Sequence, residues 1–415
     1  MTAVASAAIA QRSMGDPAIE YPLWPPLTSG CPKTSTKAVS FPVEVTYDYE
    51  AVPSDLFQRE RPSAGLHGWA PLLPPLDDRL HLGIGDTPLL SVPSIDRFTG
   101  ARTLLKDESR NLTWSHKDRL NLCTISAAAL TGAAGVVVAS SGNHGASAAA
   151  LSARLGLPCV VITSTGMPPA IGSFLAAYGA AVIVVEREAR WQVLRDIVSR
   201  LHYHPVSNLT TTHTGHPFGV EGYKTIAYEL FLQLDRTAPE AVFVPTGYGE
   251  LLYGVHKGFA ELRELGLTSR LPRMYACEPA ARAPLARALD LGLPATTVPS
   301  ADTSAYAIGT TVSGYRSTVA VRDSGGQAIR VTDEEMAVAQ RELARAGMWQ
   351  ELSASAGVAG LRQMIASGAR FDGPIVCLCT SSGFKDKNVG QGTWQAGDTD
   401  WTSIRRELHR QGLPV

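Results

Sequence analysis

The feature that most constrains the fold is an alternation of short β-branched runs and longer amphipathic segments that begins at Gly135. The first series has apolar runs at 135–139, 158–162 and 181–185, with helical patterns at 146–155 and 171–178 between them. Runs that are apolar throughout are buried on both faces, as parallel strands between helices are. We therefore predict an α/β fold with parallel-rich sheets that are covered by helices on both faces.

The alternation resumes at Ala241 and gives a second unit. Predicted strands lie at 241–245, 273–277 and 374–379, and predicted helices lie at 251–265, 333–347 and 355–368. Two such units indicate two domains with a cleft between them. We assign 100–207 to a smaller domain, and 81–99 together with 208–415 to a larger one. Residues 1–80 are rich in proline and hold one alternating run, at 38–47, so we expect an N-terminal extension there.

The charge balance excludes several classes of partner. Lys and Arg number 37 against 38 Asp and Glu, so the net charge of −1 gives no field that attracts nucleic acid or an anionic membrane surface. No apolar segment is long enough to cross a bilayer, and the start lacks the pattern of a secretory signal. We expect a cytoplasmic protein whose partner is a small molecule.

The cysteines give no sign of a metal site. The chain has 6 of them, scattered, and most lie inside apolar runs, where a free thiol behaves as a small hydrophobe. Cys377 and Cys379 lack the two-residue gap of a zinc knuckle or a redox pair. We therefore predict a reducing compartment and no bound metal.

A polar loop at 111–119 holds a candidate nucleophile. It reads N-L-T-W-S-H-K-D-R and precedes an apolar run at 120–130. A lysine amine is a nucleophile only without its extra proton, and partial burial beside a cation such as Arg119 lowers its pKa. Lys117 is therefore a candidate for an imine with an aldehyde. The alternative is a solvated lysine at the polar entry of a helix, which this loop taken alone favours.

The loop that follows the predicted strand 135–139 suits an anion. Ligands of open parallel sheets bind beyond the carboxyl ends of the strands. Residues 140–145 read S-S-G-N-H-G, and their short donors and glycines suit a carboxylate held on backbone N–H groups at a helix start. A helix that is merely capped by Ser or Asn is the alternative.

The loop that follows the predicted strand 241–245 indicates a phosphate cradle. Residues 246–254 read T-G-Y-G-E-L-L-Y-G, so the backbone can approach an anion and the next helix adds its dipole. The loop lacks the Gly-Lys-Ser/Thr ending of a nucleoside triphosphate loop. A dinucleotide fingerprint with Glu278 as the ribose-binding acid is the rival, although its third glycine is misplaced.

The last of the strand-end loops, 379–386, is rich in hydroxyl groups. A lysine, an asparagine loop, a phosphate cradle and a hydroxyl cluster, in this order, suit an aldehyde cofactor that carries a phosphate and a pyridine ring. The predicted cofactor is pyridoxal 5'-phosphate.

Together these motifs resemble those of the fold type II pyridoxal-phosphate enzymes, the tryptophan synthase beta-like superfamily, and within it the threonine synthase-like branch. The resemblance runs from about Gly83 to Asp386 and rests on the segments 106–119, 140–143, 221–225, 245–249 and 380–386. It implies that the cofactor lies in the cleft between the two domains and that the protein is a homodimer.

The resemblance also implies a role for each site residue. Lys117 would form the Schiff base with the cofactor and, once released, remove the Cα proton. Asn143 would bond the ring hydroxyl, and Thr380 would meet the pyridine nitrogen. The cofactor phosphate would lie on Thr246, Gly247, Tyr248, Gly249, Glu250 and Leu251. The substrate would contact Ser115, His116, Ser140, Ser141, Gly142 and His144, with its carboxylate on the last three.

Three positions depart from the pattern of the family. Gly219 stands where threonine synthases usually have an arginine that clamps the phosphate of homoserine phosphate, a bidentate role that glycine cannot fill. Trp114 stands where a glycine is usual, and we expect it to narrow the pocket over the cofactor. His116 replaces a common phenylalanine and serves either proton transfer or packing.

The implied role of Thr380 bears on the reaction. A hydroxyl does not hold the ring nitrogen protonated as a carboxylate would, so prompt loss of a leaving group is favoured over transamination. We predict a lyase or synthase that acts on a small L-amino acid by Cα deprotonation and β-elimination through an aminoacrylate, with ammonia release or β-replacement. The alternatives are threonine synthase, a cofactor-binding relative without turnover, and a nucleotide-binding dehydrogenase.

Overall fold

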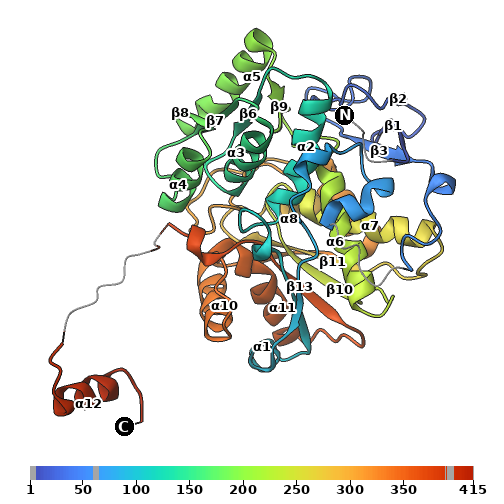
Figure 1. Cartoon of the computed structure of the whole chain (residues 1–415). Coiled ribbons are helices and arrows are strands. Elements are labelled where there is room, and N and C mark those ends of the chain that lie inside the picture. The colour runs from blue at the N-terminus through green and yellow to red at the C-terminus, as the bar shows by residue number, and fades with distance from the viewer. Residues whose placement is uncertain (1–5, 59–64, 388, 390–396, 415) are drawn as a thin grey trace.

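The computed structural model describes residues 6–58, 65–387, 389 and 397–414. Its largest sheet has six strands in the order β12-β11-β10-β13-β5-β4. Their bounds are β4 Leu89–Ser91, β5 Thr103–Asp107, β10 Ala241–Pro245, β11 Arg273–Pro279, β12 Gln327–Val331 and β13 Ile375–Cys379. All neighbouring strands are parallel except β4, which is antiparallel to β5. The prediction of a parallel-rich sheet is confirmed (Figure 1).

Helices cover both faces of this sheet, as the alternation along β10 shows. Val242 and Val244 belong to one buried cluster, and Phe243, whose side chain points the other way, belongs to another. The first cluster takes in α6 (Gly219–Gln233), α7 (Glu250–Glu264), α8 (Pro284–Asp290) and α9 (Tyr315–Ser324). The second takes in α1 (Pro93–Thr99), α10 (Asp333–Arg345) and α11 (Ala356–Ala366).

The second sheet has four parallel strands in the order β8-β7-β6-β9. Their bounds are β6 Val136–Ala139, β7 Cys159–Thr163, β8 Ala181–Val184 and β9 His204–Pro205. Val136 and Val138 share a buried cluster with α2 (Lys117–Leu130), α3 (Asn143–Leu155) and α4 (Pro169–Ala177). Val137 packs on the opposite face with Leu194 of α5 (Arg190–Leu201). Helices therefore cover both faces of β6 and β7. The edge strand β8 is exposed along its length, so the expectation that the run 181–185 is buried on both faces is wrong.

The range 1–80, assigned to an N-terminal extension, forms a small antiparallel sheet and short 3-10 turns. The sheet has the order β2-β1-β3, with β1 Ala8–Ser13, β2 Glu20–Pro22 and β3 Val43–Tyr47. Only the second half of the predicted run 38–47 is a strand, because Pro42 cannot donate to a ladder.

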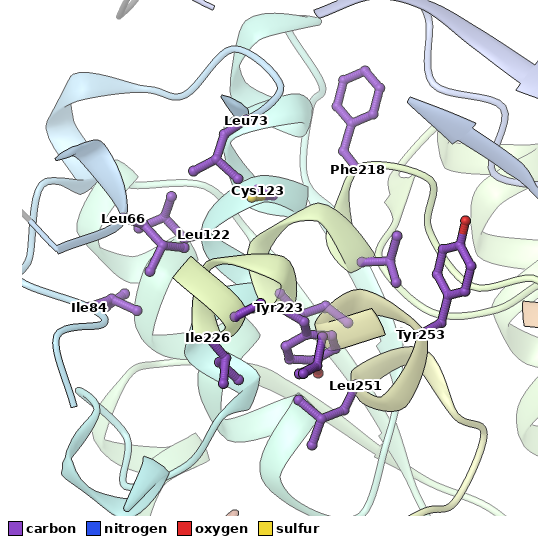
Figure 2. Packing of buried hydrophobic residues seen from close by; sticks show 14 of the residues in the cluster. Leu66, Leu73, Ile84, Leu122, Cys123, Phe218, Tyr223, Ile226, Leu251 and Tyr253 are labelled. Atoms are coloured by element: carbon purple, nitrogen blue, oxygen red, sulfur yellow. The ribbon is translucent and has the colours of Figure 1, made fainter. Parts of the chain in front are cut away.

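The segment that follows packs against the helices of the larger sheet. Figure 2 shows Leu66, Leu73 and Ile84 near Leu122 and Cys123 of α2, and all five belong to one buried cluster. The N-terminal segment thus packs against α2, and its 3-10 helix Gly65–Leu72 also contacts α6.

The division into 100–207 and 81–99 with 208–415 stays a prediction. β5 lies within the first of these ranges, yet it pairs with β13 and β4 of the six-stranded sheet. The chain therefore passes from the larger sheet to the smaller one after β5, through α2. A further helix, α12 (Trp401–Arg410), follows the body and buries none of its side chains. In the described part of the chain no helix is long and apolar enough to cross a membrane.

Candidate active site

A cavity of about 660 Å³ opens where the strand-end loops of the two sheets meet. Its walls come from the loops after β6 and β7 of the smaller sheet, from those after β10 and β13 of the larger sheet, and from the start of α2. The segment 186–191 at the start of α5 and the loop 306–312 complete them. These loops lie at the carboxyl ends of parallel strands, where ligands of open α/β sheets bind.

Most of the residues that the sequence assigned to the site line this cavity. They are His116, Lys117, Ser140, Ser141, Gly142, Asn143, His144, Gly247, Tyr248, Gly249, Glu250, Leu251 and Thr380. Ser115 and Thr246 are buried behind the wall instead. The backbone of Ser115 forms an isolated antiparallel β-bridge with that of Ser381. The hydroxyl of Thr246 donates to Val244 O at 2.7 Å. Both residues therefore support the loops rather than face the cavity.

Lys117 is the first residue of α2, and its Nζ lies 2.9 Å from the hydroxyl of Tyr223 on α6. Burial lowers the pKa of Lys117, and the nearby Glu250 opposes that shift. Burial also raises the pKa of Tyr223, so the phenol keeps its proton. A desolvated amine beside a neutral phenol suits a nucleophile or a base.

The position of the lysine loop is set by a buried carboxylate. Asp118 accepts hydrogen bonds of 2.6 Å from both the backbone N–H and the hydroxyl of Thr113. The expectation that Arg119 lowers the pKa of Lys117 is wrong, because Arg119 points away and pairs with Glu108 at 2.7 Å and Glu229 at 2.5 Å. Burial, and not the charge of Arg119, lowers the pKa of Lys117.

The carboxamide of Asn143 is held between a cation and an anion. Its Oδ1 accepts from Lys385 Nζ at 2.8 Å and from Ser381 at 3.2 Å, and its Nδ2 donates to Glu351 at 2.8 Å. An amide nitrogen carries two N–H groups, so one remains for a ligand in the cavity. Neither Lys385 nor Glu351 was among the residues expected to form the site.

The glycine loop after β10 leads into the N-terminus of α7 without a capping side chain. Gly249 is the N-cap residue with φ 83°, and a Cβ there would lie 2.2 Å from Cβ of Ser317. A helix start without a side-chain cap leaves backbone N–H groups for an anion.

An acidic side chain stands at the first position of this helix. Glu250 lies 3.3 Å from Nε2 of His213, whose ring stacks on Tyr248 with centroids 4.1 Å apart. Burial raises the pKa of Glu250, but His213 and Lys117 outweigh it and lower that pKa overall. The carboxylate is therefore ionised, and a cation must offset its charge before a phosphate can bind close by.

His116 and Thr380 form the side of the cavity next to Lys117. The backbone N–H of His116 donates to Thr380 O at 3.0 Å, and Nδ1 lies at the same distance from that oxygen. The ring packs on Tyr223 with centroids 5.4 Å apart. Burial and the charge of Lys117 lower the pKa of His116 well below its usual value, so the ring is neutral at neutral pH.

Trp114 does not narrow the pocket, contrary to expectation. It is not among the residues that line the cavity, and its side chain is 43% exposed. The ring packs in a surface cluster with Phe174 and Phe384. Its backbone has φ 62°, the left-handed region that explains why a glycine is usual at this place.

The alternative interpretation, a dinucleotide-binding site, needs Glu278 as the acid that binds the ribose. Both oxygens of Glu278 accept backbone N–H groups of α8, from Leu285 at 3.0 Å and Ala286 at 2.8 Å. The residue is fully buried and does not line the cavity, so it is a helix cap rather than a ribose ligand. In the described residues no group of three or more His, Cys, Asp or Glu side chains could hold a metal ion.

The residues present fit pyridoxal phosphate. The uncapped start of α7 suits its phosphate, the free N–H of Asn143 suits its ring oxygen, and the amine of Lys117 suits its aldehyde. Several buried polar atoms of the wall also have no hydrogen-bond partner among the described residues, namely Nε2 of His144, Oγ1 of Thr310 and Oε1 of Glu351. Such atoms are satisfied when a polar ligand binds.

Fold and site together define a pyridoxal-phosphate enzyme of fold type II. The chain belongs to the family described as "Pyridoxal-phosphate dependent enzyme", whose model matches residues 80–381. It is 31% identical to the threonine synthase of Methanosarcina acetivorans over 354 residues, which covers 83% of this chain and 86% of that protein. It is 33% identical to the threonine synthase of Methanocaldococcus jannaschii over 361 residues, or 84% and 87% of the two chains.

Solved structures share the fold. Maize serine racemase superposes with a TM-score of 0.64 at 22% identity and covers 79% of this chain and 93% of its own. The processed form of threonine deaminase isoform 2 from Solanum lycopersicum gives a TM-score of 0.62 at 18% identity, with 79% and 88% coverage. The comparisons confirm the predicted family, fold type, cofactor and enzyme class.

Proposed function

We propose that the protein is a pyridoxal-phosphate-dependent lyase that removes a β-substituent from a small L-amino acid. The observation that carries the proposal is the position of Lys117. Its desolvated amine lies 2.9 Å from a neutral phenol and faces the same cavity as the glycine loop and the asparagine loop. When bound, the cofactor supplies an aldehyde that reacts with amines and a conjugated ring that withdraws electrons from Cα.

The chain's own residues then bind the cofactor at its two ends. The N–H groups at the start of α7, in the loop 246–251, hold the phosphate, and the free N–H of Asn143 donates to the ring oxygen. The hydroxyl of Thr380 meets the pyridine nitrogen. Because a hydroxyl does not fix a proton on that nitrogen, loss of a leaving group from Cβ is favoured over transamination.

The loop 140–144 receives the substrate carboxylate. The helix α3 begins at Asn143 with Gly142 as its N-cap and without a side-chain cap, so its first N–H groups are donors for an anion. His144 lines the cavity beside this helix start, and burial lowers its pKa to about 3. The neutral ring serves as a hydrogen-bonding group there, and Lys117 is the base that takes the Cα proton.

A panel of amino acids tests this proposal. The holoenzyme is mixed with L-serine, L-threonine, their O-acetyl and O-phospho forms, and O-phosphohomoserine, and the visible band of the cofactor, keto acid and ammonia are followed. We expect a band shift and product from the β-substituted amino acids. Product from none of them would overturn the proposal.

Threonine synthase is the second candidate, favoured by the 31% and 33% identity to the two archaeal threonine synthases. Against it stands Gly219, at the place of the phosphate-clamping arginine. A Cβ at this glycine would lie 2.9 Å from Cγ2 of Thr124 and 3.0 Å from Cγ of Leu120, so the packing excludes a longer side chain. Threonine formed from O-phosphohomoserine alone would favour this candidate over the β-elimination.

We also propose a cytoplasmic homodimer. The six cysteines are free and buried, which suits a reducing compartment. Sedimentation at several protein concentrations tests the dimer, and a monomer throughout would contradict it.

The division into a smaller domain at 100–207 and a larger one at 81–99 and 208–415 is also part of the proposal, and limited proteolysis tests it.

A further inference from the structure

Where β6, β7 and α5 form the cavity wall, several hydrogen-bond donors lie around the hydroxyl oxygen of Ser141. Arg190, the first residue of α5, donates from Nη1 to the hydroxyl oxygen of Ser141 at 3.3 Å. The hydroxyl of Thr163 and the backbone N–H of Ser164 point at the same oxygen, at 2.9 and 3.3 Å. A hydroxyl oxygen accepts two hydrogen bonds, and Thr163 can donate to Ser164 O at 3.4 Å instead. The Ser141 oxygen then accepts Arg190 and Ser164 N–H, and Nη2 of Arg190 has no acceptor among the described residues.

Arg190 lacks an anionic partner. Its Nε donates to the backbone oxygen of Arg187 at 3.1 Å, and among the described residues no carboxylate lies within ion-pair distance of the guanidinium. Burial lowers its pKa, which the more distant Glu188 partly offsets. Glu186 and Glu188 line the cavity but are exposed to water. The guanidinium carbon lies 5.7 Å from the ring centroid of Trp191, a cation–π contact that neutralises no charge. A half-buried cation without a carboxylate partner favours a ligand that supplies the negative charge.

The proposed reaction involves two other anionic groups, and each is already assigned to a binding site. The cofactor phosphate lies at the start of α7, and the substrate α-carboxylate lies at the start of α3, next to Gly142. Arg190 is then available for a third anion, on the substrate's side chain. This inference rests on the proposed β-elimination and extends it to the nature of the leaving group.

The histidines near Lys117 favour a leaving group that needs no proton. Burial and the charge of Lys117 lower the pKa of His144 to about 3 and that of His116 well below its usual value. Both rings are neutral at neutral pH, so neither is an imidazolium that could protonate a departing hydroxide. A phosphate ester departs as a stable anion without such help.

We propose that Arg190, with the hydroxyl of Ser164, binds the phosphate of a substrate that is phosphorylated on its Cβ oxygen, such as O-phospho-L-serine. Lys117 takes the proton from Cα, the Cβ–O bond breaks, and inorganic phosphate leaves with the bonding electron pair. A double bond remains between Cα and Cβ. The guanidinium stabilises the phosphate before and during its departure.

Steady-state kinetics of the holoenzyme test the assignment, with O-phospho-L-serine, L-serine and O-phosphohomoserine as substrates. The variants are Arg190→Gln and Arg190→Lys, and the control is Arg200→Gln on the same helix, where the side chain is exposed. For Arg190→Gln we expect kcat/KM with O-phospho-L-serine to fall about 10- to 100-fold, chiefly through KM, and to change less than about twofold with L-serine. Arg190→Lys should retain part of the preference for O-phospho-L-serine over L-serine.

A binding measurement gives a second readout. Inorganic phosphate should compete with O-phospho-L-serine in the native protein and in Arg200→Gln, and compete at least about tenfold more weakly in Arg190→Gln. An equal loss with L-serine would instead assign Arg190 to the α-carboxylate. Weaker binding of pyridoxal phosphate would assign it to the cofactor, and a preference for O-phosphohomoserine would move the phosphate to Cγ. Each of these overturns the inference, whereas reaction with none of the three substrates overturns the proposed function.

Discussion

The ammonium of Lys385 lies 2.8 Å from Oδ1 of Asn143, inside the wall of the cavity. Glu351 accepts from the other end of the same carboxamide at 2.8 Å, so a cation and an anion fix which way the amide points. The nitrogen, and not the oxygen, is therefore presented to the ligand. This is the orientation in which Asn143 donates to the ring oxygen of pyridoxal phosphate.

Lys385 should make cofactor binding depend on pH. Burial lowers its pKa to about 8, so the side chain is charged below that pH and neutral above it. We expect the affinity for pyridoxal phosphate to fall as the pH rises through this value, because the neutral amine holds Asn143 less firmly. In Lys385→Met the affinity should be several-fold lower and lack this step. Equilibrium titration of the visible band from pH 6 to 10 checks this, with Lys37→Met, an exposed lysine of the N-terminal segment that does not line the cavity, as the control.

The sequence predicted those parts of the site that follow from strand-end loops. The motifs around Lys117, Asn143 and Gly247 each come directly after or before a strongly patterned element, so their convergence follows from the parallel sheet. Glu351 and Arg190 belong to no such motif. Glu351 precedes a 3-10 turn and Arg190 begins a helix, and only tertiary packing brings either to the cavity.

The same limit holds for the fold. The long apolar strands and helices were predicted to within a few residues, because burial on two faces imposes a strong pattern. Short strands such as β9 and half-exposed ones such as β12 have no such pattern, and α12 is polar on most of its surface. The position of Trp114 was predicted wrongly because the usual glycine was taken as a sign of space in the pocket, whereas it reflects a left-handed backbone that directs the ring to the surface.

Replacement of Lys117 should abolish the covalent link to the cofactor. In Lys117→Ala the buried amine beside Tyr223 is lost, so we expect pyridoxal phosphate to bind without the visible band of a lysine adduct and kcat to fall by at least about 10³-fold. Borohydride reduction followed by peptide mass spectrometry should find the label at Lys117 in the native protein. Lys387→Met should keep the label, and a label on Lys385 in its place would contradict the assignment.

Tyr223 should act on the proton transfer rather than on binding. Its hydroxyl lies 2.9 Å from Nζ of Lys117, and the phenol is neutral because burial raises its pKa. Tyr223→Phe keeps the ring but loses the hydrogen bond that orients the amine, so we expect kcat to fall about tenfold with KM little changed. The isotope effect with Cα-deuterated substrate should rise. Tyr228→Phe, on the same helix but bonded to Glu261, is the control.

His213 should be needed for the cofactor phosphate. Without it the carboxylate of Glu250, at the first position of α7, loses the imidazole that lies 3.3 Å away and helps to lower its pKa, next to the helix start that receives the phosphate. We expect His213→Phe, which can still stack on Tyr248, to raise the Kd of pyridoxal phosphate about tenfold. The double variant His213→Phe/Glu250→Gln should recover most of the affinity. Equal losses in the single and double variants would show that the pair acts through packing instead.

Glu221 should tie stability to pH through the N-terminal segment. Its carboxylate is fully buried and pairs with Lys257 at 2.6 Å and Lys224 at 2.8 Å, and it accepts from the hydroxyl of Tyr47 on β3 at 3.0 Å. Burial opposes ionisation, but the two lysines outweigh it and lower the pKa of Glu221 to about 2. The ionised form of Glu221 is therefore more stable, relative to the protonated form, in the folded chain than in the unfolded chain.

The sign of the effect follows from that shift. A carboxylate whose pKa is lowered on folding stabilises the protein above its unfolded value of 4.5, and this contribution is lost as the pH falls toward 2. Glu221→Gln leaves the buried Lys257 without a carboxylate partner among the described residues, whereas Lys224 keeps Glu261 at 2.8 Å, so we expect about 3 kcal/mol less free energy of unfolding at pH 7. Urea titration should show the difference narrowing below about pH 4.5, where Glu221 begins to lose its charge in the unfolded chain. Glu264→Gln, exposed at the end of α7, should change little at either pH, and a constant difference down to pH 2 would contradict the assigned charge.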